Sequence, residues 1–367
     1  MSATCENTAA NFTERGFWDM LATMQAQTLA AAPSPAAVSS RALVSYRSVL
    51  WAALLTYPFV PALLYQSSSL AASSSALAVT SVLLAYAWSI TGPVAAWFSL
   101  CEADRARLNR RERPQLVREA ILAAIGAPFF VLSGVVLRWV RLPGEQAALW
   151  YLVLAGVAAA RWLPAPQQRL AHEYIWQRIH RISAILLVLF GVAHVGNHLA
   201  AVDSLQAHVS VQNALRTVYR WPAIEALIVI AALVQVGTGW VTVARARLQR
   251  SNGLRNLQVL AGAYLGMFFL SHLTGVFGGR LQHTDTTFAW ATGGAAGLIS
   301  TPRLGSFLPY YSLAVFAFLV HAATAGRWML AGPLGESRAL KVCYGLLGLS
   351  GVVTLALLLP LCGVRLG

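Results

Sequence analysis

Histidine is the residue type whose distribution most clearly indicates chemistry in this sequence. All eight histidines follow residue 171, and several fall within apolar stretches: His194, His198, His272 and His321. An ionisable side chain in hydrocarbon is costly and usually faces a partner or a cofactor. A single histidine within an apolar stretch could equally be a neutral imidazole that is hydrogen-bonded to a neighbouring helix. Because these lie on three separate apolar stretches, a shared cofactor is the favoured interpretation.

The depth of these residues indicates which of them act together. A helix rises about 1.5 Å per residue, which places His194 and His272 each roughly 20 Å from the same membrane face. Two imidazoles at matching depth could bind both axial positions of one haem, which requires neutral ring nitrogens and a dry, apolar pocket. His321 is expected nearer the inner leaflet. Four glycines could make room for the macrocycle or serve plain helix packing: Gly191, Gly196, Gly262 and Gly266.

The sequence HVGNH places His194 and His198 four residues apart, on one face of a helix. This spacing also suits a non-haem metal site, as in membrane hydroxylases. Such enzymes need several histidine-rich clusters, whereas this sequence has one. His194 is the expected iron ligand because it lies deeper. His198, nearer the interface, could contact a haem propionate or a quinone.

The composition predicts an all-α, polytopic membrane protein. Hydrophobic residues make up 57% of the 367 residues and charged residues 11%, whereas soluble proteins carry about 25% charged residues. A soluble enzyme, a secreted disulfide scaffold and a disordered chain are thereby excluded. The net charge of +14 is explained by basic loops on one side of a bilayer, not by nucleic-acid binding. The four scattered cysteines offer no ligand set for an iron–sulfur cluster.

Nine stretches are apolar over about the 20 residues that a membrane span requires. The expected organisation is a cytoplasmic tail (1–45), a four-helix membrane part (46–164) and a five-helix part that contains the histidines (165–367). The predicted spans are 47–66, 77–100, 118–138, 147–164, 179–202, 221–243, 257–279, 308–330 and 340–362.

The basic residues predict how these spans are oriented. If the arginine-rich segment 102–118 is cytoplasmic, 20 of the 27 basic residues lie on the cytoplasmic side, as the positive-inside rule requires. The expected location is the inner (plasma) membrane of a bacterium, with the N-terminus in the cytoplasm and the C-terminus outside.

Three segments carry a resemblance to a known family. They are QRIHRISAILLVLFGVAHVGNH, NLQVLAGAYLGMFFLSHLTGV and YYSLAVFAFLVHAATAGRW. Together with their order, they make residues from about 170 to 367 resemble the single-chain cytochrome b membrane anchor of succinate dehydrogenases and fumarate reductases. The resemblance implies haem b with His194, His272 and His321 as ligands, and it pairs His194 with His272 on an outer haem.

The sequence departs from the family at the second of the five helices. There the family carries a further haem ligand, but the stretch YRWPAIEALIVIAALVQVGTGW contains no histidine and has Gln235 near the expected position. One haem is therefore expected. A second would have only His321, unless His180 of the R-x-H motif or His172 substitutes. The four preceding helices are foreign to the family.

The resemblance implies electron exchange between quinone and cytoplasmic redox subunits. This chain has no flavin fingerprint and no cluster ligands, so such chemistry would need partner chains. The alternative is a non-enzymatic membrane scaffold, or a haem-based sensor, that keeps the same bundle. The sequence leaves open whether the protein is an enzyme.

Polar residues near the outer ends of the helices complete the candidate site. Glu225 is a carboxylate near the outer end of a predicted span; it could accept a proton from quinol or simply pair with Arg220 or Arg216. Arg216, Arg220 and Arg280 could bind haem propionates or anchor the helix ends.

Two histidines are expected in the outer loops, His208 in one and His283 in another. The second of these loops, 278–306, is long, and long loops are often functional. It could cover the pocket, with polar contacts from His283 and Asp285, or lie along the interface.

Overall fold

Helices make up all the regular secondary structure in the part of the chain that the structure describes. The computed structural model describes residues 40–70, 75–106, 108, 112–163, 173–246, 251–301 and 304–367. The predicted all-α class is confirmed. Residues from Ser40 to Gly367 belong to one compact unit. His172 and most of the predicted tail lie outside the described residues.

The N-terminal part contains two helices that break. α2 gives way to α3 with a bend of 58°, and α5 gives way to α6 with a bend of 68°. Pro58 lies in the first break, where its missing N–H and fixed φ interrupt the helical hydrogen bonds. The helices are α2 (Ser40–Thr56), α3 (Phe59–Leu70), α4 (Ser75–Arg105), α5 (Glu112–Ala124), α6 (Gly126–Trp139) and α7 (Gln146–Ala159).

The C-terminal part has five long helices and a set of shorter ones on the connecting segments. The long helices are α8 (Glu173–Ala200), α10 (Pro222–Ala246), α11 (Gly253–Leu281), α14 (Phe307–Leu334) and α15 (Glu336–Leu361). Between them lie α9 (Leu205–Tyr219), α12 (Phe288–Thr292) and α13 (Gly297–Ser300). The sequence predicts five long helices after residue 165, but it predicts a loop where α9 forms.

The number of spans differs from the prediction. Six described helices are long and apolar enough to cross a membrane, or up to eight if each bent pair is one span. The predicted span 147–164 corresponds to α7, whose 14 residues cover about 21 Å. A hydrocarbon core is about 30 Å thick. Nine spans are therefore not confirmed, while the multi-pass membrane class is.

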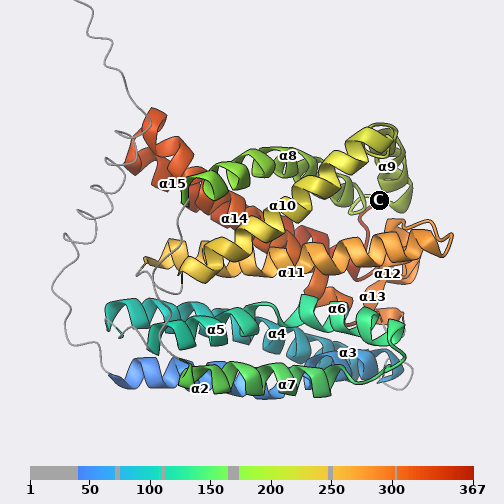
Figure 1. Cartoon of the computed structure of the whole chain (residues 1–367). Helices are drawn as coiled ribbons and strands as arrows, with labels where there is room; N and C mark the ends of the chain where they lie inside the picture. Colours follow the sequence, from blue (N-terminus) through green and yellow to red (C-terminus); the bar gives the residue numbers. More distant parts are fainter. Residues whose placement is uncertain are drawn as a thin grey trace, which may run out of the picture. The chain divides into compact units, whose positions relative to one another are not determined.

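Helix α11 lies between the two sets of helices. Figure 1 shows α2 to α7 on one side of it and α8, α10, α14 and α15 on the other. Polar contacts join the sets: the Trp97 indole donates to the Gly253 carbonyl over 2.8 Å, and the Tyr86 hydroxyl to the Ser312 hydroxyl over 2.9 Å. α11 itself packs against α4, α5 and α6 of one set and against α10 and α14 of the other.

Candidate functional site

A cavity of about 730 Å³ lies among the helices of both parts of the chain. This volume is within the range of small-molecule and cofactor sites, which are mostly apolar with a few convergent polar groups. Its lining includes His194 and His198 from α8, His272 from α11 and the aromatic side chains of Phe190 and Phe268. The apolar surroundings and the three imidazoles make this cavity the candidate site.

His272 has no hydrogen-bond partner among the described residues. Its ring stacks on Phe268, with ring centres 5.2 Å apart and planes inclined by 12°. Its centre lies 6.3 Å from that of His194. The side chain is partly exposed to the cavity, so its ring nitrogens are open to a ligand there. An imidazole that opens on an apolar cavity with neither nitrogen paired has the character of a ligand side chain.

His194 begins a row of imidazoles that leads to α9. Its Nε2 lies 3.2 Å from Nε2 of His198, and Nδ1 of His198 lies 3.3 Å from Nε2 of His208. His208 is fully buried and also receives a hydrogen bond from the Asn197 amide over 3.2 Å. The expectation that His208 lies in an outer loop was wrong: it belongs to α9, which packs this residue against α8.

The separation of His194 and His272 suits one metal ion held between them. A metal–imidazole bond is about 2 Å long, so two imidazoles on opposite sides of one ion have ring centres about 6 Å apart. The ring centres here are 6.3 Å apart. A haem fits this donor set, since neutral imidazoles in an apolar pocket are the ligands that it takes. Iron binding at Nε2 of His194 would replace its hydrogen bond to His198.

His321 forms a second imidazole pair, with His180, whose ring centre is 6.5 Å away. These two residues are not among those that line the cavity. Nδ1 of His321 donates to the Gln258 carbonyl over 2.9 Å. Both nitrogens of His180 have partners, at 2.8 Å in Thr238 and 3.0 Å in Gln235. The region in which a second haem would have to bind is thus occupied by a hydrogen-bond network.

This second region is also closely packed. A Cβ atom built on Gly262 would come within 2.8 Å of the His321 ring. Gly262 therefore accommodates this imidazole and not a macrocycle. Gly191 similarly accommodates the Phe318 ring, which a Cβ there would meet at 2.4 Å. At Gly191 and Gly262, the close contacts therefore agree with a role in helix packing and not with room for a macrocycle.

No group of three or more histidine, cysteine or acidic side chains is placed to hold a metal ion within the described segments. The non-haem metal centre weighed for the HVGNH pair therefore has no ligand set there. A haem iron differs, because the macrocycle supplies four of its ligands and two imidazoles suffice.

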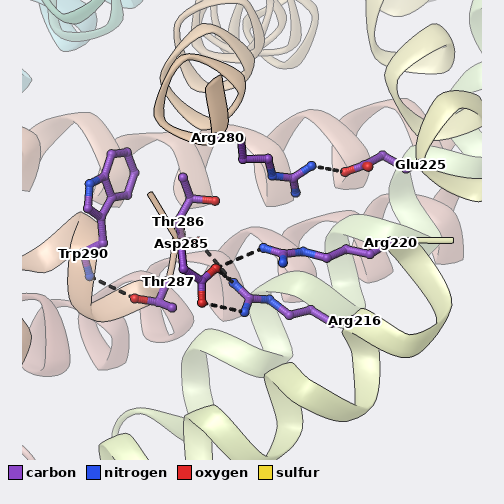
Figure 2. Close-up of polar contacts among 8 residues, drawn as sticks. All are labelled: Arg216, Arg220, Glu225, Arg280, Asp285, Thr286, Thr287 and Trp290. Atoms are coloured by element: carbon purple, nitrogen blue, oxygen red, sulfur yellow. Dashed lines mark hydrogen bonds and ion pairs between the residues drawn. The ribbon is translucent and has the colours of Figure 1, made fainter. Parts of the chain in front are cut away.

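Charged side chains stand at one end of the cavity. Arg220, Glu225 and Arg280 line it, whereas Arg216 does not. Figure 2 shows Asp285 between the guanidinium groups of Arg216 and Arg220, and Arg280 facing Glu225 beside them. Glu225 thus pairs with Arg280 and not with Arg216 or Arg220, the partners considered from the sequence.

Asp285 attaches the loop after α11 to α9. Its carboxylate accepts hydrogen bonds from Arg216 over 3.0 and 3.2 Å, and from Arg220 over 3.3 Å. These bonds hold the pKa of the carboxyl group below its usual value. The same loop brings Thr286, Thr287 and Trp290 to the cavity. The loop thus lines the cavity, but His283 and Asp285, the polar contacts considered from the sequence, are not among its lining residues.

His208 provides a prediction about pH. Burial, aided by the charge of Arg216, lowers the pKa of this imidazole to about 4. In the unfolded chain its pKa is about 6.5. Between these values the unfolded chain binds a proton that the folded chain does not, so the free energy of unfolding falls as the pH falls through this window. Burial of this residue accounts for a loss of roughly 2–3 kcal/mol.

Denaturation in detergent at pH 7 and pH 4.5 measures this loss. His208→Gln, which keeps an amide opposite Asn197, should lose clearly less stability than the wild type over the same interval. Equal losses in the two proteins would contradict the role of this residue.

Comparison of the chain with models of protein families, with curated protein sequences and with solved structures finds no match. The class of protein therefore rests on the fold and its apolar helices, which define an all-helical, multi-pass membrane protein in contact with the lipid bilayer.

Tyr57 and Gln212 are among the cavity residues that were not anticipated from the sequence. Tyr57 from the first break and Gln212 from α9 both line the cavity, and each is only 6% exposed. Neither side chain has a hydrogen-bond partner among the described residues. A tyrosine and a glutamine in apolar helices carry no motif, so only the packing of the helices could identify them.

Proposed function

We propose that this protein is a b-type haem membrane protein that transfers electrons, with quinone as its small redox partner. The observation that carries the proposal is the unpaired His272 imidazole, which opens on an apolar cavity with its ring centre 6.3 Å from that of His194. His194 and His272 would hold haem b. When bound, the haem supplies one-electron chemistry that no side chain provides.

The side chains around the cavity support the two roles that such a site needs. The guanidinium groups of Arg220 and Arg280 are placed to bind carboxylates such as haem propionates. His198 lines the cavity beside His194 and also contacts His208 through its Nδ1. Glu225 is a carboxylate at the cavity end that could take the proton released by quinol.

The test of the haem proposal is a pyridine haemochrome assay on protein purified after expression with ample haem supply. We expect one haem b per chain and a reduced-minus-oxidised absorbance band. A protein without haem would contradict the proposal and leave a membrane scaffold. A haem protein that quinol does not reduce would be a sensor and not an electron carrier.

Glu225→Gln tests the quinol step separately. This change keeps the shape and removes the negative charge, so haem content should stay at the wild-type level. A positioned general base contributes about 10²–10⁴-fold in rate, and we expect quinol-dependent haem reduction to slow by at least about tenfold. Stopped-flow absorbance measures this rate. The matched control is Glu145→Gln, an exposed carboxylate outside the cavity lining. An unchanged rate in Glu225→Gln would remove this residue from the proposal.

The wider setting follows from the same proposal. The chain would lie in a bacterial inner membrane with its N-terminus in the cytoplasm. Redox partner subunits would dock on the cytoplasmic face, where the basic segment 102–118 is expected. Accessibility of single introduced cysteines to a membrane-impermeant thiol reagent would establish this orientation.

A further inference from the structure

Two helix breaks meet at one wall of the cavity. α2 ends beside Tyr57, and α6 begins at Gly126. The two residues touch: a Cβ atom on Gly126 would lie 2.7 Å from the Tyr57 ring. Glycine at this position therefore permits the close approach. Irregular backbone at membrane depth is tolerated where it is buried in protein or lines a cavity, and broken helices often form the binding sites of membrane proteins.

The Tyr57 side chain is held rigidly at this wall. Its ring packs against Trp150 and Phe130, with ring centres 5.1 and 5.3 Å away. Trp150 is itself fixed, because its indole N–H donates to the Leu54 carbonyl over 2.8 Å. The Tyr57 hydroxyl has no hydrogen-bond partner within the described chain, although the residue lines the cavity and is 6% exposed. It is therefore a fixed donor that a ligand in the cavity could engage.

The surroundings indicate the chemistry of a ligand for this donor. The neighbouring lining is apolar and aromatic, with Phe130 and Val131 from α6 and Tyr311 from α14. The rings that pack on Tyr57, those of Phe130 and Trp150, carry no charge. A neutral, planar ring with a carbonyl oxygen as acceptor fits such a wall.

We propose that the break between α2 and α3, together with α3 and α6, completes a quinone-binding subsite, in which the Tyr57 hydroxyl donates a hydrogen bond to a quinone carbonyl oxygen. The inference rests on the proposed function for the class of its ligand. It also gives the N-terminal helices a role: they supply the wall opposite the histidine-bearing helices. The haem ligands come from α8 and α11, so the two sites share the cavity but use different side chains.

Tyr57→Phe tests the subsite because it removes one oxygen atom and keeps the ring that packs on Gly126. The probe is a short-chain 1,4-naphthoquinone, titrated into the purified full-length protein in detergent. Saturable quenching of tryptophan fluorescence and calorimetry give its Kd. Loss of one hydrogen bond in a buried site should weaken binding by about tenfold. The matched control is Tyr344→Phe, because Tyr344 is exposed on α15 and is not a lining residue.

The outcomes separate this inference from the haem proposal. Weaker binding in Tyr57→Phe alone, with haem per chain unchanged in all three proteins, supports the subsite. Equal affinity in Tyr57→Phe and wild type, or no saturable binding in wild type, overturns it. A wild-type protein that lacks haem but binds the quinone through Tyr57 would keep the subsite and refute the haem proposal.

Discussion

Replacing His272 with alanine is expected to abolish haem binding. The imidazole opens on the cavity without a hydrogen-bond partner among the described residues, and its ring centre is 6.3 Å from that of His194. Removing it takes away one of the two imidazoles that would hold the haem and leaves an apolar methyl group in its place. Haem per chain, measured by the pyridine haemochrome assay, should fall from about one to near zero, on the order of a tenfold loss or more.

Two further variants make this prediction specific. His321→Ala should keep about one haem per chain, because His321 is bonded to Gln258 outside the cavity lining. His283→Ala, an exposed residue after α11, should also keep it. Equal haem loss in His272→Ala and His283→Ala would mean that the assay reports unfolding. Two haems in wild type, one of them lost in His321→Ala, would show that the second imidazole pair opens to bind iron.

Replacing Arg113 with methionine is expected to destabilise the fold strongly. Arg113 lies 2.9 Å from the Asp104 carboxylate, and the exposed fractions of the two side chains are 6% and 9%. Asp104 also accepts a hydrogen bond from Asn256 at the start of α11 over 2.8 Å. Removing one partner of a buried ion pair leaves an uncompensated charge and costs about 3–5 kcal/mol. The free energy of unfolding in detergent micelles measures this loss.

A second substitution tests whether the charge is the cause. Asp104→Asn combined with Arg113→Met removes the uncompensated charge and keeps an acceptor for Asn256, so the double variant should be more stable than Arg113→Met alone. The control is Arg338→Met, since Arg338 is exposed on α15 and should change stability by less than about 0.5 kcal/mol. If the double variant is the less stable one, the loss comes from packing of the arginine stem.

The sequence by itself determined the class of this protein and the candidate ligands. Long apolar stretches can satisfy their backbone groups in lipid only as helices, so composition predicts an all-α membrane protein. Depth along a helix follows from residue number, which is why His194 and His272 could be paired from their positions in the chain alone. Span number was less predictable, because the breaks beside Tyr57 and Gly126 bend helices that form continuous apolar runs in the sequence.

Only the tertiary structure decided which side chains share the cavity. A single helix does not reveal which neighbour its face meets, so the Tyr57 wall, the unpaired Gln212 and the burial of His208 in α9 could not be inferred from local patterns. The ion-pair partner of Glu225 could not be inferred from local patterns either. Glu225 pairs with Arg280 on α11, 55 positions away, and not with the arginines nearest to it in the sequence. The physical reason is that helix packing brings together residues far apart in the chain, whereas periodicity reports only the faces that are apolar.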